Sequence, residues 1–412
     1  MTIKSLFITK EVPVPIKSGV SLRNWQNMNV MMKFGPVAVF SAANWTPNYH
    51  TLSGVKLWKH YNVDDTRTKW EELERRLWWL RPIGDPDADW PYCRFTAQKL
   101  AELMADFQPD LVILEQVWLY RYLSVVQQFP CRIIFDNHNI EAHLAAQPDR
   151  SQESIRTQLK AKIQTSHLRE MEKKFTHQVD QVWLCSEDDV QLCQQMYGKQ
   201  TPLYVIPNGV NIDNYAKAFN HQYEPVEKVK NRERTILFLG QLSYYPNKIA
   251  AELLIDEIYP KIKQNYPDCQ LLLVGRTPTQ KMLAVAQKDP DIIVTGNVPE
   301  VQPYVAAASM MVVPLLHGGG TRLKLLEAFA SGCPVISTAK GAEGLDVIDG
   351  KHLLIRNTIE EILEGIEKLW SQPSLSLELR NNAYQLVKTE YSWEASYERV
   401  TQAMKQILPN QY

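Results

Sequence analysis

Short apolar runs alternate with segments of helical periodicity along the whole chain, and this alternation most constrains the fold. A parallel sheet covered by helices on both faces produces it, because its strands are apolar on both sides and need helical crossovers. The sequence therefore predicts an α/β fold with doubly wound parallel sheets. The predicted strands of the first half are Lys4–Thr9, Val37–Ser41, Leu111–Glu115, Arg132–Asn137, Val182–Cys185 and Tyr204–Ile206. Those of the second half are Thr235–Gly240, Gln270–Val274, Ile292–Thr295, Met311–Pro314, Val335–Ser337 and His352–Ile355.

The length of 412 residues is enough for two or three domains, and each half has a Rossmann-like pattern. The first predicted domain covers residues 1–219. A polar, highly charged segment, 220–234, is the predicted linker. The second domain then covers 235–391, and a last helical pattern covers 392–412.

Charge and cysteine content exclude several classes of protein. The net charge of −1 does not favour a nucleic-acid partner. No apolar run approaches the roughly 20 residues that a membrane span needs. The six cysteines are scattered without a CxxC pair or metal-ligand spacing, which is typical of reduced cytoplasmic proteins.

Asp87-Ala-Asp89 has the DxD form of some metal sites, but it lies in a turn-rich stretch with no strand before it, so we expect no metal there.

A glycine-rich turn between a strand and a helix is the sharpest local motif. Gly318, Gly319 and Gly320 allow close approach of a ligand to the backbone, and Thr321 stands at the expected helix N-cap. The free N–H groups at a helix start bind anions. A tight turn with surface charges is the alternative, and it is favoured only if the three glycines are taken alone.

Charged residues follow the turn at spacings that suit a nucleotide. Arg322 and Lys324 place two cations in the first helical turn, where the helix dipole disfavours them unless an anion is bound. Glu327 lies three residues after Lys324, on the same side of the helix. Its carboxylate can accept hydrogen bonds from two ribose hydroxyls. The constellation predicts a site for a nucleoside diphosphate.

The same stretch resembles the donor site of group 1 (family 4) glycosyltransferases. The resemblance rests on Gly-Gly-Gly-Thr-Arg-Leu-Lys-Leu-Leu-Glu-Ala, Gly-Cys-Pro-Val-Ile-Ser-Thr and Gly-Ala-Glu-Gly-Leu. It implies the GT-B fold, in which two Rossmann-like domains with parallel sheets face a central cleft and the last helix crosses back to the first domain. It also implies a nucleotide-sugar co-substrate, no cofactor and no metal, and retention of anomeric configuration. Glu327 matches the family glutamate that holds the donor ribose. The other signature glutamate is Gly319 here, so the amides of Gly319 and Gly320 are its expected replacement.

Further donor contacts are implied by resemblance. Gly240 and Gln241 open the loop that covers the diphosphate, where the common family pattern has arginine and lysine, and Lys248 is displaced from the lysine position. Arg276 follows the next strand and faces the nucleotide or forms a structural turn. Val298 lies in the loop that meets the nucleobase through backbone groups, and Glu343 is a weaker candidate.

The first half carries a second polar motif at the end of a strand, Phe135-Asp-Asn-His-Asn-Ile-Glu141. His138 resembles the family histidine beside the donor sugar and the reaction centre, and a histidine that is structural or titrates at the surface is the alternative. We expect Asn139 on the acceptor side, Asp136 to orient the loop and Glu141 to cap the next helix.

A first loop beside the acceptor is also implied by resemblance. Ser18 and Gly19 could offer amides to a phosphate there, and Arg23 is a weaker candidate. The segment Glu74–Arg81 mixes cations with aromatic residues. It is interpreted as a packed helix end, with peripheral contact to the inner face of a membrane as the alternative.

The sequence thus predicts a glycosyltransferase that moves a sugar from a nucleoside diphosphate sugar to a glycan or lipid-linked hydroxyl acceptor, with His138, Arg322 and Lys324 as catalytic residues. By family habit, the pathway is cell-surface polysaccharide or glycolipid synthesis. A GT-B sugar-nucleotide epimerase and a non-catalytic nucleotide-sugar-binding partner subunit stay open as alternatives. A nicotinamide dehydrogenase is disfavoured because neither half has GxGxxG after its first strand.

Overall fold

The computed structural model describes residues 2–14, 18–47, 51–81, 83–147, 154–318 and 322–409. It forms two compact units, Met1–Pro207 with Ser396–Tyr412, and Asn208–Ala395. This division differs from the predicted boundary at 219 and the predicted linker 220–234, because residues 208–234 group with the second unit. Within that unit the Lys230 N–H donates to Gln270 Oε1 over 2.7 Å, and the Arg380 guanidinium donates to the Phe219 carbonyl.

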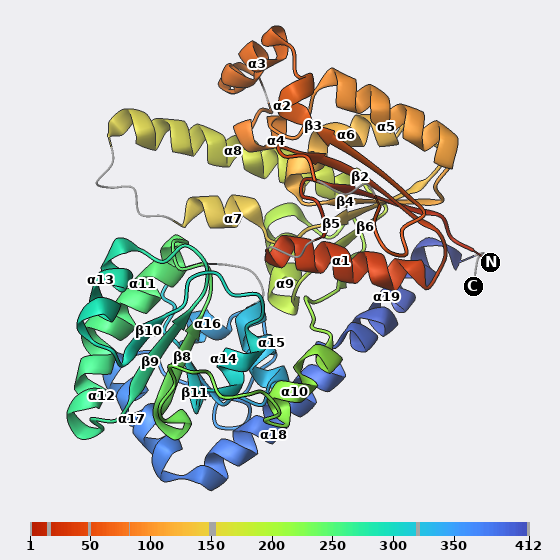
Figure 1. Cartoon of the computed structure of the whole chain (residues 1–412). Coiled ribbons are helices and arrows are strands. Elements are labelled where there is room, and N and C mark those ends of the chain that lie inside the picture. The colour runs from red at the N-terminus through yellow and green to blue at the C-terminus, as the bar shows by residue number, and fades with distance from the viewer. Residues whose placement is uncertain are drawn as a thin grey trace. The chain divides into compact units, whose positions relative to one another are not determined.

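The elements of the first unit follow one another along the chain in this order (Figure 1): β1 (Ser5–Thr9), α1 (Gly19–Met32), β2 (Val37–Ala43), β3 (Leu57–Asn62), α2 (Val63–Thr66), α3 (Lys69–Arg76), η1 (Trp78–Leu80), α4 (Pro86–Asp89), α5 (Arg94–Phe107), β4 (Leu111–Glu115), η2 (Val117–Leu119), α6 (Tyr120–Val126), β5 (Arg132–Asp136), α7 (Glu141–Ala146), α8 (Ile155–His177), β6 (Gln181–Leu184), α9 (Glu187–Tyr197) and β7 (Leu203–Val205). The last helix, α19 (Trp393–Ile407), belongs to this unit from Ser396 onward.

Among the described residues, seven strands form the first sheet in the order β3-β2-β1-β4-β5-β6-β7, all parallel. The predicted strands of both halves are found with ends shifted by at most two residues, so the α/β prediction is confirmed. β3 was not predicted. Its sequence, Leu-Trp-Lys-His-Tyr-Asn, lacks an apolar run because it is an edge strand whose side chains are only partly buried.

Side chains of the first sheet alternate between two cores, as the two-residue period of a strand requires. Phe7 and Trp183 face α1 and α19, with Met28 and Met404 packed against them. Ile8 and its equivalents on the other strands face α5, α6 and α8. In α19, Ala403 also accepts a hydrogen bond at its carbonyl from Gln181 over 2.9 Å. Figure 1 shows α1 and α19 together beside this sheet.

The elements of the second unit are η3 (Ile212–Tyr215), α10 (Ala216–Phe219), η4 (Arg232–Arg234), β8 (Thr235–Leu239), α11 (Tyr245–Leu253), η5 (Leu254–Ile258), α12 (Tyr259–Asn265), β9 (Gln270–Val274), α13 (Gln280–Lys288), β10 (Ile292–Val294), α14 (Gln302–Ala306), β11 (Met310–Val313), α15 (Leu323–Ala330), β12 (Val335–Ser337), α16 (Ala339–Ala342), β13 (Leu354–Ile355), α17 (Ile359–Ser371) and α18 (Pro373–Glu390). Six parallel strands of the described chain pair in the order β10-β9-β8-β11-β12-β13. η5 is a π-helical turn between two α-helices, and Pro260 follows it, where the missing proline N–H interrupts the α-helical ladder.

The strand orders fix where ligands can bind. In each sheet the chain builds outward from a first strand and then returns to its other side, so switch points lie at β1/β4 and at β8/β11. Ligands of open parallel sheets bind beyond the carboxyl ends of the strands at such points. The predicted donor loops follow β8 and β11, so they share one switch point within the second unit.

Candidate functional site

The glycine-rich turn ends in a short helix that begins later than predicted. α15 starts at Leu323, with Arg322 as its N-cap residue at ψ 75°, outside the helical region. The predicted N-cap, Thr321, lies outside the described residues, as do Gly319 and Gly320. Gly318 is described and has φ +108°, a conformation that only glycine adopts readily.

Arg322 is held by backbone carbonyls of the glycine-rich turn and of α16. Its Nη2 donates to the carbonyls of Gly318 over 2.9 Å and Lys340 over 3.0 Å. Glu343 lies 3.6 Å from the same nitrogen and also pairs with Lys340 over 2.7 Å. The guanidinium is therefore buried and fixed close to the turn that was predicted to hold a diphosphate, and the predicted candidate Glu343 contacts the arginine.

Lys324 lies beside the loop that follows β8. Its Nζ donates to Asn247 Oδ1 over 2.7 Å, and Asn247 Nδ2 donates to the Gln241 carbonyl over 3.1 Å. A methyl group on Gly240 would lie only 3.2 Å from Lys324 Nζ, so the absence of a side chain at Gly240 makes room for the ammonium. The structure thus brings together Gly240, Gln241 and Lys324, and their role at the donor stays a prediction.

The environment of Lys324 favours the neutral amine over the charged ammonium form. Burial and, to a smaller degree, the nearby charge of Arg322 lower its pKa to about 7, although Glu327 acts in the opposite direction. The face of Phe238 lies 4.5 Å from Nζ, which favours the ammonium form to a lesser degree. An anion that contacted Lys324 and Arg322 would restore the full charge of the lysine.

Glu327 is oriented by a residue that the sequence analysis did not select. The Tyr215 hydroxyl donates to Glu327 Oε1 over 3.1 Å. Burial raises the pKa of Glu327 to about 6, although this hydrogen bond and Lys324 act in the opposite direction. One carboxylate oxygen of Glu327 is thus fixed by Tyr215, and its contact with a ribose stays a prediction.

The remaining predicted donor residues lie in neighbouring loops. Arg276 Nη2 donates to Gln241 Oε1 over 3.1 Å, so these two side chains meet above the ends of β8 and β9. A methyl group on Gly275 would lie 1.7 Å from the Gly240 carbonyl oxygen, which shows how closely the two strand ends approach. Val298 is partly buried against the core of this unit.

In the first unit, the strand-end motif is anchored by a buried ion pair. Asp136 Oδ1 accepts from Arg23 Nη2 over 2.5 Å, Asn27 donates to Oδ2 over 2.7 Å, and neither charged side chain is exposed. Burial alone would raise the pKa of Asp136, but Arg23 and His138 together outweigh it and lower the pKa to about 2. Arg23, a weaker candidate for an acceptor phosphate, is instead committed to Asp136 and to the Ile206 carbonyl, 2.5 Å away.

His138 lies beside this ion pair, with Nε2 3.6 Å from Asp136 Oδ2. Burial lowers its pKa, and the carboxylate of Asp136 only partly restores it, so the neutral imidazole is favoured at pH 7. The His138 carbonyl accepts from Cys185 Sγ over 3.3 Å. The histidine is thus buried and is not a surface residue, and its functional role stays a prediction.

The loop around His138 is fixed by Glu172 of α8. Its carboxylate accepts from the N–H groups of Glu141 and Ala142 over 3.1 and 3.2 Å, and from Asn137 Nδ2 over 3.0 Å. Glu172, and not Glu141, therefore caps α7. Asn139 instead donates to Glu141 Oε1 over 3.1 Å.

Ser18 and Gly19 begin α1. The Ser18 hydroxyl donates to Glu11 Oε2 over 2.7 Å, and its N–H donates to Ser21 Oγ over 2.9 Å. Ser18 is therefore a helix cap whose amide is already used by the capping box, contrary to the expectation of a phosphate contact. Gly19 is the first residue of the helix.

The DxD stretch serves the structure of the first unit. Asp89 Oδ1 pairs with Arg121 over 3.0 Å, and Asp89 Oδ2 pairs with Arg81. Among the described residues, no group of three or more His, Cys, Asp or Glu could hold a metal ion. Nor does the described part of the chain contain a helix long and apolar enough to cross a bilayer.

Tyr215, Asn247 and Glu172 are the site residues that sequence reasoning missed. Asn247 stands where the family pattern has its lysine, and that departure was the available signal. Tyr215 and Glu172 have no local signal, because each acts on a residue far away in the sequence.

Two family models match the chain. The model described as Glycosyltransferase Family 4 matches residues 64–214, and the model described as Glycosyl transferases group 1 matches residues 233–372.

Among curated proteins, the phosphatidyl-myo-inositol mannosyltransferase of Mycobacterium tuberculosis is 30% identical over 154 residues, 36% of this chain and 39% of that protein. An uncharacterized 44.6 kDa protein in the cps region of Klebsiella pneumoniae is 24% identical over 164 residues, 38% of this chain and 42% of that protein. The matches thus span about two fifths of these relatives.

Solved structures match over nearly the whole chain. The sucrose-phosphate synthase of Thermosynechococcus elongatus is 17% identical with a TM-score of 0.72, and the match covers 99% of this chain and 100% of that one. Anabaena HepE in complex with UDP-glucose is 12% identical with a TM-score of 0.65, over 98% and 100%. At these identities the likeness shows the fold.

Proposed function

The chain belongs to the group 1 glycosyltransferases with the GT-B fold, and we propose that it transfers a hexose from a nucleoside diphosphate sugar to a hydroxyl acceptor. The observation that carries the proposal is the meeting of Arg322, Lys324 and Gly240 at the β8/β11 switch point. Two fixed cations beside a glycine turn suit a diphosphate. Anabaena HepE, which has this fold, was solved with UDP-glucose, which supports a nucleotide-sugar donor here.

We propose a separate role for each of the candidate residues. We assign Arg322 and Lys324 to the departing diphosphate, because fixed cations stabilise charge that develops as the glycosidic bond breaks. The nucleotide sugar is a co-substrate, and we propose no further cofactor. We assign Glu327 to the ribose, and the neutral His138 to the sugar and acceptor. We also propose that the anomeric configuration of the sugar is retained, and NMR spectroscopy of the product determines that configuration.

Titration calorimetry with UDP, GDP and ADP tests the donor site. We expect one nucleotide to bind, and Arg322→Ala to weaken it about 10- to 100-fold, the usual range for a hydrogen-bonded charge. Arg232→Ala is the matched control, since Arg232 lies before β8 and contacts His221. No binding of any of the three nucleotides to the wild type would contradict the donor site.

Once the nucleotide base is known, analysis of the products distinguishes the transferase from the epimerase and from the non-catalytic partner subunit. Incubation with the matching nucleotide sugar and a mixed glycan and glycolipid acceptor pool should release the nucleoside diphosphate and a glycosylated acceptor. An epimerised nucleotide sugar would support the epimerase. Unchanged nucleotide sugar despite tight binding would support the partner subunit.

We also propose that the first unit contacts a membrane that carries a lipid-linked acceptor. Large apolar side chains are exposed at Trp70, Leu73 and Leu77, which share one face of α3 and its end, and at Trp79 and Leu80. Only Trp78 of this segment packs, against His167 of α8, so the predicted packed helix end applies to that residue alone. The start of α8 adds exposed Ile155 and Leu159 among three cations, with no acidic residue from 154 to 168.

Cosedimentation with vesicles of zwitterionic and anionic lipid tests this contact. The variant Trp70→Ala/Trp79→Ala should partition about tenfold less, because each indole contributes apolar area on insertion. Leu377→Ala removes an exposed apolar residue of the second unit and should have no effect. Equal partitioning of all three proteins, or none by the wild type, would refute the contact.

A further inference from the structure

The first unit contains a pocket of about 450 Å³ at the carboxyl ends of β1 and β2. Its lining includes two aromatic side chains, Trp45 and Trp90, both partly exposed. Polar groups surround them: Lys10, Glu11, Asn44 and Asp87. The pocket lies next to the β1/β4 switch point, where open parallel sheets bind ligands.

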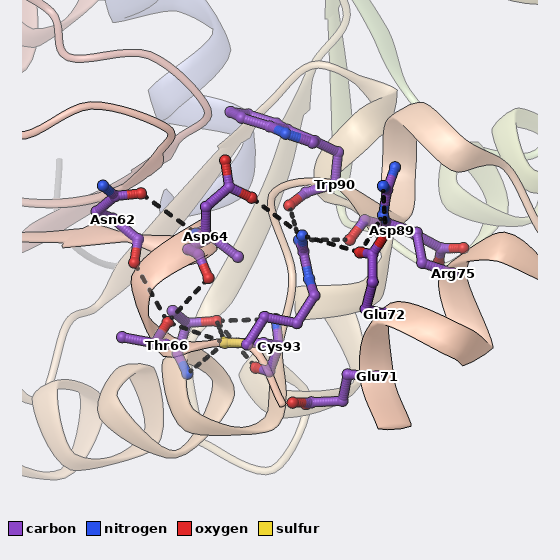
Figure 2. Close-up of polar contacts among 12 residues, drawn as sticks. Asn62, Asp64, Thr66, Glu71, Glu72, Arg75, Asp89, Trp90 and Cys93 are labelled. Atoms are coloured by element: carbon purple, nitrogen blue, oxygen red, sulfur yellow. Dashed lines mark hydrogen bonds and ion pairs between the residues drawn. The ribbon is translucent and has the colours of Figure 1, made fainter. Parts of the chain in front are cut away.

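Trp90 comes from a segment between β3 and α5 that is tied down by polar contacts (Figure 2). The Arg67 guanidinium donates to the Trp90 carbonyl and, over 3.1 Å, to Asp64 Oδ1. In Figure 2 the indole of Trp90 extends away from these contacts. The backbone is therefore fixed while the aromatic face remains available to the pocket.

Glu11 connects the pocket to the predicted reaction residues of the same unit. It accepts from the Ser18 hydroxyl over 2.7 Å, which fixes the carboxylate at the start of α1. Its charge also reaches His138: burial lowers the pKa of His138, while Asp136 and, to a smaller degree, Glu11 raise it. His138 follows β5, which lies two strands from β1 in the same parallel sheet, so its loop and the pocket lie at the same edge of that sheet.

The chemistry of the lining suits a sugar ring. A pyranose has an apolar C–H face, which packs on an indole, and hydroxyl groups at its edge, which bond to carboxylates and amides. The charges of the lining also favour a neutral sugar over an acidic one. Glu11 and Asp87 oppose the single cation Lys10, and burial lowers the pKa of Lys10, although Asp87 and Glu11 partly restore it. An acidic sugar would meet more negative than positive charge.

We propose that this pocket binds an uncharged pyranose of the acceptor, with Trp45 and Trp90 as its aromatic walls and Glu11, Asn44 and Asp87 as hydroxyl partners. The inference rests on the proposed function and names the class of acceptor, a neutral glycan end. It gives the segment between β3 and α5 a role in acceptor specificity.

Saturation-transfer NMR with methyl glycosides tests the pocket in the full chain. The probes are the methyl pyranosides of glucose, mannose, galactose and N-acetylglucosamine, with methyl glucuronoside as the acidic probe. At least one neutral glycoside should bind the wild type, and Trp45→Ala or Trp90→Ala should weaken it about tenfold or more, as is usual for a stacked aromatic anchor. Phe95→Ala, which removes an exposed aromatic residue outside the pocket, is the matched control.

A charge reversal keeps the test independent of folding. Asp87 is exposed, so Asp87→Lys should leave the fold intact and allow methyl glucuronoside to bind, which the wild type excludes. Preference of the wild type for the glucuronoside, or unchanged binding in both tryptophan variants, would overturn the inference. Nucleotide calorimetry on the same variants distinguishes the two failures: normal nucleotide binding without glycoside binding leaves the proposed function standing.

Discussion

Lys324→Met should lower the rate of sugar transfer by about 10²- to 10³-fold, the usual cost of removing one group that stabilises developing charge. The side chain is held by Asn247 close to Gly240, so its ammonium lies at the β8/β11 switch point. Methionine keeps the length and apolar packing of the side chain and removes only the charge. The measurement is kcat/KM with the nucleotide sugar identified by calorimetry.

The pH dependence provides a second signature of Lys324. Its pKa of about 7 in the free protein means that the amine is mostly neutral at pH 8 and mostly charged at pH 6. A diphosphate favours the charged form, so binding should take up a proton, and affinity should fall by up to tenfold per pH unit above 7. A nucleotide sugar is the right ligand for this titration, because its diphosphate carries no group that titrates near neutrality.

Calorimetry in buffers of different ionisation enthalpy measures the proton uptake directly. Lys324→Met should lose this uptake, and its affinity should be flat from about pH 7 to 8.5, above the range in which Glu327, with a pKa of about 6, still titrates. Lys261→Met, which removes an exposed lysine of α12, should behave like the wild type. Full activity of Lys324→Met, or a flat profile for the wild type, would remove Lys324 from the donor site.

Asp136→Asn should destabilise the first unit by about 3–5 kcal/mol, because it leaves the Arg23 guanidinium buried without its carboxylate. Neither side chain of this pair is exposed. Hydrogen exchange of the β5 amides reports on this unit separately from the second. Glu74→Gln is the matched control, since it breaks an exposed pair with Arg94 and should cost at most about 1 kcal/mol.

The sign of the pH effect follows from the lowered pKa of Asp136. The value is about 2 in the folded chain, below the ordinary 3.8, so its stabilising effect is present above about pH 4. That stabilisation is lost as the pH falls from 4 through 2, where the folded carboxylate also becomes protonated. The difference between wild type and Asp136→Asn should therefore shrink over this range. A loss below about 1 kcal/mol at pH 7 would contradict the assigned role of the ion pair.

Much of the fold could be predicted from the sequence because buried parallel strands leave a strong local signal. Runs such as Leu111–Glu115 are apolar on both faces. β3 was missed because an edge strand keeps polar side chains in contact with water. The boundary between the units also moved, because the charged segment that was predicted to link them bonds to the second unit through Lys230 and Gln270.

The candidate site was also only partly predictable from the sequence. The sequence by itself determined which groups carry charge and where they stand relative to a turn: Arg322, Lys324 and Glu327 share one short stretch, and His138 follows a strand. Only the tertiary structure decided how those groups are held. Tyr215 orients Glu327 across 112 positions, and Arg23 fixes Asp136 across 113. Such partners have no local pattern, since the sheet order brings distant strand ends together, and burial there moves the pKa of Lys324 from 10.5 to about 7.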